Sequence, residues 1–226
     1  MGDKRQISMA VVRRLPKYHR YLLELIRNDV DRISSKELSD RIGFTASQIR
    51  QDLNNFGDFG QQGYGYNVKD LYNEISNILG LHANYNMVIA GAGNLGQAIA
   101  GYSNFEKEGF RVKALFDINP KLIGLSIRDI EIFDIDNLRN YLHDNKVDIG
   151  IICTPRVQAQ KVADVMVKNG ITAIWNFAPT DLDVPRGVIV ENVHLLDSLL
   201  TLTYRVNEPK LLDYINKDPE EIVEEE

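Results

Sequence analysis

The chain is poor in cysteine, in long apolar runs and in histidine. Its single cysteine, Cys153, cannot form a disulfide within the chain, and such usage is typical of a reducing cytoplasm. No run of about 18 or more apolar residues occurs, so no membrane-spanning helix is predicted. Residues 1–16 are charged and lack the apolar core of a secretion signal. We therefore expect a cytoplasmic protein without membrane contact.

Acidic side chains outnumber basic ones, 32 to 26, but the excess is unevenly placed. Residues 1–69 hold 12 basic and 8 acidic side chains, a net charge of +4, which leaves −10 on residues 70–226. A basic N-terminal part attracts phosphates, whereas an acidic remainder avoids nonspecific contact with DNA. Ordinary scatter in composition produces a similar imbalance, so charge alone leaves both interpretations open.

Residues 15–56 have the pattern of three short helices. In the first, apolar residues recur at steps of three and four, which gives the helix one apolar face. Ser34 and Glu37 form a capping box for the second helix, which ends at Gly43. Thr45 opens the third helix in a similar way. Two short helices joined by a tight glycine turn predict a helix-turn-helix.

Residues 57–68 predict a β-hairpin wing beside this motif, because glycines occupy four of the nine positions from 57 to 65. A recognition helix presents its first turns to base edges, where arginine suits guanine and glutamine suits adenine. A three-helix scaffold with a decorative loop is the alternative. We predict the following DNA contacts: Ala46, Ser47, Gln48, Arg50, Gln51, Gln62, Gly63, Tyr64 and Tyr66.

A different pattern begins near residue 87, where strands and helices alternate. This alternation predicts a parallel sheet with helices on both faces, a Rossmann-type α/β domain. A helix within residues 70–86 that ends at Gly80 links the two parts. The predicted strands cover residues 87–90, 111–116, 147–153, 171–177 and 188–193, and the predicted helices cover 95–102, 135–143 and 158–169. We expect a winged-helix domain over residues 1–80, a dinucleotide domain over 81–195, a C-terminal helix over 196–216 and an acidic tail over 217–226.

Gly91, Gly93 and Gly96 match the G-x-G-x-x-G pattern between a strand and a helix, the context that a dinucleotide site requires. Asp117 ends the second strand, 21 residues after Gly96, where a carboxylate accepts hydrogen bonds from ribose hydroxyls and repels a 2′-phosphate. The pattern therefore predicts NAD(H) rather than NADP(H). Further predicted contacts are Ala92, Asn94, Leu95, Tyr102, Thr154, Asn176 and Phe177. A glycine turn without a nucleotide, and loops ended simply by proline, are the alternatives.

Machinery for hydride transfer is missing from the sequence. Of the four histidines only His194 follows the last strand, and no substrate domain comes after it. Cys153 ends an apolar strand, and buried cysteines are usually inert. A cofactor that is bound but not consumed acts as a signal, so we expect no catalytic residues and no metal site. An NAD-dependent oxidoreductase with N-terminal dimerisation helices, or a repressor governed by another nucleotide such as ATP, are the alternatives.

The sequence contains six signatures: residues 14–18 (RLPKY), 48–53 (QIRQDL), 63–68 (GYGYNV), 91–96 (GAGNLG), 176–179 (NFAP) and 190–193 (VENV). Together these motifs resemble those of the redox-sensing transcriptional repressor (Rex) family. The resemblance implies a homodimeric repressor that binds a near-palindromic operator and is released when NADH rises. It also implies that a C-terminal helix, about residues 196–206, is exchanged between subunits and lies between the partner's two domains.

The chain departs from the family pattern at three positions. Gln51 stands where the family has lysine in the recognition helix, and Gln62 stands where it has a basic wing residue. His194 replaces an aspartate that in the family alternates between an arginine, matching Arg20, and a tyrosine, matching Tyr102. The resemblance thus implies a switch formed by Arg20, Tyr102 and His194, with an altered charge at one member.

Overall fold

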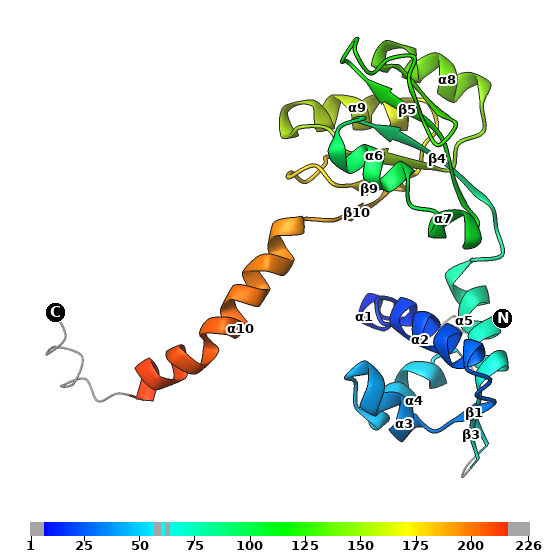
Figure 1. Ribbon diagram of the computed structural model, residues 1–226, viewed down its shortest axis with the longest axis vertical. Coiled ribbons are helices and arrows are strands. Elements are labelled where there is room, and N and C mark those ends of the chain that lie inside the picture. The colour runs from blue at the N-terminus through cyan, green and yellow to red at the C-terminus, as the bar shows by residue number, and fades with distance from the viewer. Residues whose placement is uncertain (1–6, 57–59, 62–63, 217–226) are drawn as a thin grey trace, which may run out of the picture. The chain divides into compact units, whose positions relative to one another are not determined.

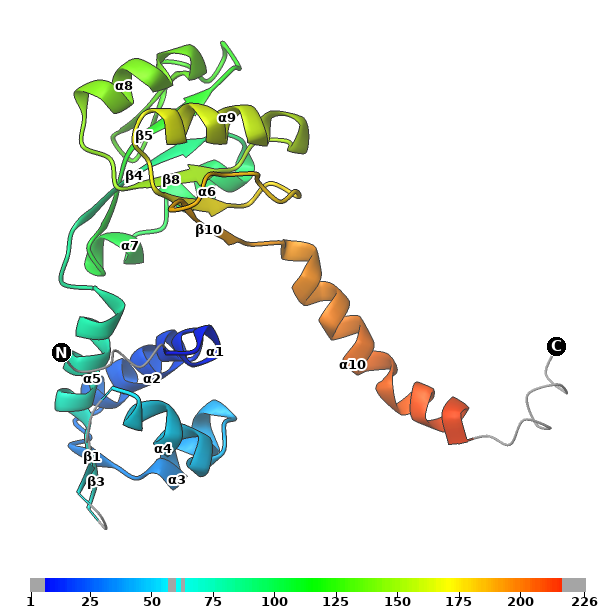
Figure 2. The ribbon, with the colours of Figure 1, turned by 180° about the vertical axis from the view of Figure 1, so that it is seen from behind.

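A computed structural model describes residues 7–56, 60–61 and 64–216, and it describes side chains for residues 7–56 and 64–208. The chain divides into two compact units, Met1–Asn84 and Tyr85–Glu226. Figure 1 labels their helices and strands, and Figure 2 gives the opposite view. The predicted wing residues Gln62 and Gly63 and the predicted tail at 217–226 lie outside the described residues.

The first unit consists of short helices and a small antiparallel sheet. Its strands run in the order β1-β3-β2, so the two wing strands are joined by a third strand that precedes the helix-turn-helix. The elements are α1 (Met9–Val12), α2 (Leu15–Arg27), β1 (Arg32–Ile33), α3 (Ser35–Ile42), α4 (Ala46–Asn54), β2 (Gly60–Gln61), β3 (Gly65–Asn67) and α5 (Val68–Leu79).

The helix ends of this unit are set by the caps that the sequence predicts. Ser34 Oγ accepts a hydrogen bond from Glu37 N at 3.1 Å, and Glu37 Oε2 accepts one from Ser34 N at 2.8 Å. Gly43 ends α3 with a left-handed φ of 72°. Thr45 then caps α4 by accepting a hydrogen bond from Gln48 N at 3.1 Å. These caps hold α3 and α4 in the helix-turn-helix arrangement, and both predicted caps are confirmed.

The helices of the first unit share one apolar core. Each of α2, α3, α4 and α5 contributes fully buried side chains from one face, as the periodicity predicts for the first three. This core fixes α4 against α2 and α3 and leaves its other face to solvent. Its most buried members are Leu15, Tyr18, Leu22, Leu38, Ile49, Leu53, Leu71 and Ile75.

The second unit is built on a seven-stranded sheet of order β10-β9-β8-β4-β5-β7-β6, parallel except for β6 against β7. The predicted Rossmann-type fold is confirmed; the β6–β7 hairpin and the short α7 were not predicted. The elements are β4 (Tyr85–Ala90), α6 (Asn94–Ala100), α7 (Asn104–Lys107), β5 (Phe110–Asp117), β6 (Ser126–Ile127), β7 (Ile130–Asp134), the 3-10 helix η1 (Ile135–Asn137), α8 (Leu138–Asp144), β8 (Ile149–Ile152), α9 (Arg156–Lys168), β9 (Ala173–Asn176), β10 (Ile189–Asn192) and α10 (Leu195–Asn216).

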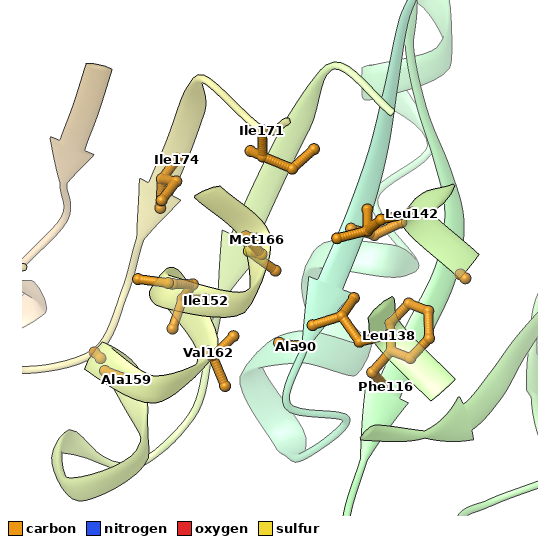
Figure 3. Packing of buried hydrophobic residues seen from close by; sticks show 14 residues of the cluster. Ala90, Phe116, Leu138, Leu142, Ile152, Ala159, Val162, Met166, Ile171 and Ile174 are labelled. Carbon is orange, nitrogen blue, oxygen red and sulfur yellow. The ribbon is translucent and has the colours of Figure 1, made fainter. Parts of the chain in front are cut away.

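Successive residues of the buried strands face opposite sides of this sheet. On β4, Val88 and Ala90 join the core under α8 and α9, whereas Met87 and Ile89 join the core that includes residues of α6. Figure 3 shows the first of these cores, with Phe116 near Leu138 of α8. Both faces of the sheet are therefore covered.

Strand β4 lies at the point where the strand order reverses. The chain passes from β4 to β5 on one side and later to β8 on the other, and ligands of such sheets bind at that crevice. Gly91 N donates to Phe116 O at 2.8 Å, and Cys153 N donates to Ala90 O at 2.7 Å. The ends of β4, β5 and β8 therefore meet at one edge.

Helix α10 follows β10 and differs from every other long helix. All its side chains from residue 195 to residue 208 are exposed, including large apolar ones. Among the described residues, no helix combines the length and apolarity that crossing a membrane requires.

Phe116→Ala is expected to lower the free energy of unfolding of the second unit by about 3–5 kcal/mol, because it removes a fully buried aromatic ring from the core. Urea denaturation followed by the fluorescence of Trp175, the single tryptophan, measures this loss. Ile118→Ala removes a side chain that is 73% exposed and should cost less than about 0.5 kcal/mol. Similar losses in both variants would contradict the packing described for Phe116.

Candidate functional site

A cavity of about 720 Å³ opens at the carboxyl ends of β4, β5 and β8. Gly91, Gly93, Asp117 and Thr154 lie on its polar side. Apolar side chains line the rest, from the residue after β5, the η1–α8 segment and α9. These are Ile118, Ile135, Leu138, Val162 and Val165, with Arg139 and Lys161 also in the lining.

The three glycines of the turn have different physical roles. Gly91 has φ +99°, and a Cβ there would lie 2.5 Å from the carbonyl oxygen of Cys153. A Cβ on Gly96 would overlap the carbonyl oxygen of Gly91, so α6 packs on the turn through bare backbone. A Cβ on Gly93 would meet nothing within 4 Å, and its φ of −72° suits any residue. The fold therefore requires glycine at 91 and 96, whereas Gly93 keeps the cavity side of the turn open.

Asp117 holds two turns with its carboxylate. Its Oδ2 accepts a hydrogen bond from Ala92 N at 2.6 Å, and its Oδ1 accepts one from Asn119 N at 2.8 Å. Each carboxylate oxygen has a further lone pair, and the residue lines the cavity. Asp117 thus fixes the glycine turn and keeps acceptor capacity for a hydroxyl group.

Thr154 supplies a polar atom without a partner. Its Oγ1 is buried and makes no hydrogen bond in the part of the chain that the structure describes. A buried hydroxyl without a partner costs free energy, so such an atom in a cavity wall indicates a missing ligand or water. This observation, together with the open Gly93, fits a group with phosphate or hydroxyl oxygens.

Seven of the eleven predicted cofactor residues lie outside the cavity lining. Ala92, Asn94, Leu95 and Gly96 belong to the glycine turn and the start of α6, and the other three lie elsewhere in the unit. Asn176 is fully buried and donates to Thr180 O and Asn192 Oδ1, both at 2.8 Å, so it joins the loop after β9 to the last residue of β10. Phe177 packs against the core under α6, with its ring centroid 4.6 Å from that of Trp175 and the two rings tilted by 60°. Tyr102 is 53% exposed and lines a separate hollow of about 220 Å³.

The apolar wall of the cavity was missed by the sequence analysis. Ile118 and Ile135 follow their strands directly, and Leu138, Val162 and Val165 lie on helix faces that also serve the core. Apolar periodicity alone cannot separate a core position from a cavity position. The available signal was Ile118, an apolar residue directly after the carboxylate that ends β5.

Cys153 lines the same cavity, and burial raises the pKa of its thiol to about 12. The thiol is therefore protonated at neutral pH and is a poor nucleophile. This agrees with the prediction that the residue is inert.

The second candidate site is the outer face of α4. Ser47, Arg50 and Gln51 are exposed, and Ala46 and Gln48 are partly exposed. Arg50 Nη1 donates to Ser35 Oγ at 2.9 Å, which holds its guanidinium near the start of α3. Predicted readers of the recognition helix thus share one accessible surface.

The two described wing tyrosines differ in their surroundings. Tyr64 is 70% exposed, and Arg32 donates to its carbonyl oxygen at 3.3 Å. Tyr66 is 8% exposed and belongs to the apolar core. Its position favours a packing role over contact with DNA.

A buried carboxylate lies on the inner side of α4. Asp52 is 1% exposed, and its oxygens accept hydrogen bonds from Arg14 Nε at 2.6 Å, Arg14 Nη2 at 2.7 Å and Tyr18 Oη at 2.6 Å. Burial by itself would raise the pKa of Asp52, but the hydrogen bonds from Arg14, Tyr18 and Gln48 hold it below its usual value. Burial, followed by the hydrogen bond to Asp52, raises the pKa of Tyr18. The carboxylate is thus ionised and the tyrosine is a permanent donor.

The three predicted switch residues are divided between the units. Arg20 is exposed in the first unit, whereas Tyr102 and His194 belong to the second. His194 Nε2 lies 3.8 Å from Asp181 Oδ1. The switch therefore stays a prediction.

Family models match both units. The model described as "Putative DNA-binding protein N-terminus" matches residues 6–54, and the model for a CoA binding domain matches residues 82–180. A redox-sensing transcriptional repressor Rex of Clostridium botulinum (strain Hall) is 70% identical over 207 residues, which cover 92% of this chain and 99% of the relative. The chain belongs to the Rex family. A Rex of Clostridium novyi is 68% identical over the same shares.

Solved Rex-family structures have the same fold. The crystal structure of RSP in complex with β-NAD⁺ and operator DNA has a TM-score of 0.88 and 61% identity, covering 94% of this chain and 98% of that one. RSP in complex with β-NADH has a TM-score of 0.86 and 59% identity, covering 93% and 99%. Rex proteins are transcriptional repressors, so an oxidoreductase with dimerisation helices is not favoured.

Asp52→Asn is expected to destabilise the first unit most near neutral pH. The pKa of Asp52 is lowered by folding, so its stabilisation is complete above the unfolded-state value of about 4 and is lost as the pH falls through the lower folded-state value. Urea denaturation between pH 7 and pH 3 should give a difference from the unaltered chain that shrinks with acid. Asp40→Asn, at an exposed position of α3, is the control and should change little. A difference independent of pH would contradict the ion pair.

Proposed function

We propose that this chain is an NADH-responsive repressor that binds operator DNA through α4 of two subunits and NAD(H) in the cavity of its second unit. One observation carries the proposal. A single chain holds a helix-turn-helix with accessible readers and a glycine-turn cavity containing a hydroxyl without a partner. RSP, 61% identical, was crystallised with both β-NAD⁺ and operator DNA.

The cofactor's place follows from the chemistry of the cavity wall. The open backbone at Gly93 and the first N–H groups of α6 would hold a pyrophosphate, and the lone pairs of Asp117 would accept from a ribose hydroxyl. The apolar side chains of Ile118, Leu138 and Val162 would pack against an adenine ring. When bound, the cofactor supplies a nicotinamide whose charge and planarity change with reduction. Asp117 repels a 2′-phosphate, which favours NAD(H) over NADP(H).

Of the remaining predicted contacts, Thr154 has a direct role and the others have supporting roles. Ala92, Asn94, Leu95 and Gly96 shape the turn, and Thr154 offers its hydroxyl to the ligand. Asn176 and Phe177 support the end of β9, through a hydrogen bond to Thr180 and through packing against the core.

On the DNA side, the first turns of α4 enter the major groove. Ser47, Gln48 and Arg50 reach base edges, and Gln51 contacts a base or a phosphate. Ala46 allows close approach at the start of α4, and Tyr64 follows the backbone with the wing residues Gln62 and Gly63. With glutamine rather than lysine at position 51, this face has one cation fewer. The affinity for DNA should therefore depend less strongly on salt concentration.

A second copy of the chain covers α10. Seven large apolar residues of this helix are each more than half exposed, which is unusual for a chain that stays monomeric. Four of them recur at steps of four, three and four, the spacing of a helix stripe that packs on a partner. They are Leu195, Leu199, Leu202 and Val206, with Leu196 and Leu200 beside them. Exchange of α10 between two subunits would bury both copies.

Coupling requires that NADH and NAD⁺ differ in affinity for two arrangements of the dimer. Tyr102 and Leu195 are our candidates near the nicotinamide, and Arg20, Tyr102 and His194 are the candidate switch. A histidine at 194 cannot pair as an anion with Arg20, so the contact that separates the two arrangements differs from the family's. As a repressor of bacterial genes, the protein acts in the cytoplasm.

NADH is expected to raise the dissociation constant for operator DNA more than NAD⁺ does, measured by fluorescence anisotropy on a labelled duplex at fixed salt.

Gly93→Ala should keep DNA binding and melting temperature nearly unchanged, because the added methyl group meets nothing within 4 Å. It should lose the NADH response, because the methyl group occupies the approach of the pyrophosphate. Equal effects of NADH and NAD⁺ on the unaltered protein would refute redox sensing. A full NADH response in Gly93→Ala would refute only the assigned cavity.

Replacing Leu199 and Leu202 together by glutamate should convert the dimer into monomers, because both charges would have to be buried in the proposed interface. Size-exclusion chromatography with light scattering should report half the mass of the unaltered protein. Val157→Glu introduces the same charge at an apolar residue of α9 that is 84% exposed, and it should leave the dimer intact. A dimeric Leu199→Glu/Leu202→Glu variant would remove α10 from the interface.

A further inference from the structure

The inner carboxylate of α4 has one contact that the ion pair does not explain. Gln48 Nε2 lies 3.4 Å from Asp52 Oδ1, one helical turn away on the same helix. Arg14 Nη2 bonds the same oxygen, while Arg14 Nε and Tyr18 Oη bond the other. The carboxylate therefore connects α2 and the α1–α2 junction to a side chain at the N-terminal end of the recognition helix.

The chemistry of the carboxylate decides which end of the Gln48 amide faces it. An ionised carboxylate only accepts hydrogen bonds, so an amide oxygen at 3.4 Å would be repelled and the NH₂ group is attracted. At this length the hydrogen bond is weak. It nevertheless favours one of the two amide orientations, which differ by exchange of the oxygen and the NH₂ group. Gln48 consequently presents its Oε1 and one remaining N–H away from Asp52.

We propose that Asp52 is a positioning residue that orients the Gln48 amide for reading an adenine in each half-site. Adenine offers its N6 amino group as donor and its N7 as acceptor in the major groove, and a glutamine with its oxygen and one N–H exposed matches both. An amide free to reverse would lose this match half of the time. The inference rests on the proposed function, because it requires α4 to read DNA.

A purely stabilising role accounts less well for the network. Buried ion pairs are often matched or exceeded in stability by apolar residues of similar volume, because desolvation offsets their attraction. Two neighbouring positions of α4, Ile49 and Leu53, hold buried apolar side chains. An apolar residue at position 52 could therefore also pack in this core. What an apolar residue at position 52 could not do is select one orientation of Gln48.

The test compares base preference rather than total affinity. The unaltered protein, Gln48→Ala, Asp52→Asn and the double variant are titrated at fixed salt against an operator duplex and a panel with single base-pair changes in both half-sites. The unaltered protein should prefer adenine at one position by about tenfold or more, as a well-placed glutamine does. Gln48→Ala should lose the preference at that position. Asp52→Asn should lower it by about twofold at that position only, because a freed amide has the matching orientation half of the time. The double variant should lose no more than Gln48→Ala alone.

Asp40→Asn, the same change at an exposed position of α3, should keep the full preference. If the unaltered protein prefers no duplex, the proposed function itself fails. If Gln48→Ala loses the preference and a folded Asp52→Asn retains it, only the positioning role fails. Uniform weakening on every duplex by Asp52→Asn would likewise overturn it, since that is the effect of loosened structure.

A measurement on the unaltered protein covers the case in which Asp52→Asn does not fold. Nuclear magnetic resonance relaxation of the side-chain NH₂ groups should find Gln48 ordered, with its signal assigned by loss in Gln48→Ala. Gln51, exposed on the same helix, should have an order parameter below about 0.6 and serves as the reference. Equal mobility of the two amides would overturn the inference.

Discussion

The close approach of backbone at the ends of β4, β5 and β8 is the constraint on which the nucleotide site depends. Gly91 has its amide on Phe116 O at 2.8 Å, and the place of its missing side chain lies 2.5 Å from the Cys153 carbonyl. Because Gly91 has no side chain, the turn after β4 can lie close to the ends of β5 and β8. Asp117 can then reach Ala92 N, and the cavity opens beyond Gly93. The shape of the cavity and the position of the Asp117 carboxylate therefore both depend on the missing side chain at Gly91.

Each unit uses one carboxylate to fix the backbone that meets its ligand. Asp117 holds a turn through two main-chain amides and remains at the cavity surface, so it can both shape the site and contact what enters. Asp52 is buried and bonded by three side chains, so in the proposed function it would act on DNA only through α4. The first arrangement suits a small ligand that must be enclosed. The second suits a rigid surface that must match a groove.

The sequence was sufficient to predict an element where a local residue pattern is compatible with only one backbone structure. Capping residues, the glycine turn and the alternation of apolar segments predicted α3, α4 and the parallel sheet. The β6–β7 hairpin was missed because Arg128 and Asp129 take positive φ angles of 48° and 66° without a glycine. Tyr66 was expected at the surface, but which face of a three-residue strand is buried depends on tertiary packing. Asn176 was correctly placed at a strand end, and only the structure shows that its amide is consumed by neighbouring loops.

The exposed leucines of α10 also bear on how the protein behaves when it is scarce. In the proposed dimer, in which α10 packs on the partner, a subunit alone would leave this apolar helix in water, where it favours aggregation. Stability and DNA affinity would then both depend on protomer concentration, because association, folding of the helix and pairing of two recognition helices are one linked equilibrium. Dilution of the protein would weaken repression even at a constant NADH/NAD⁺ ratio. Repression would therefore depend on the cellular concentration of the protein as well as on that ratio.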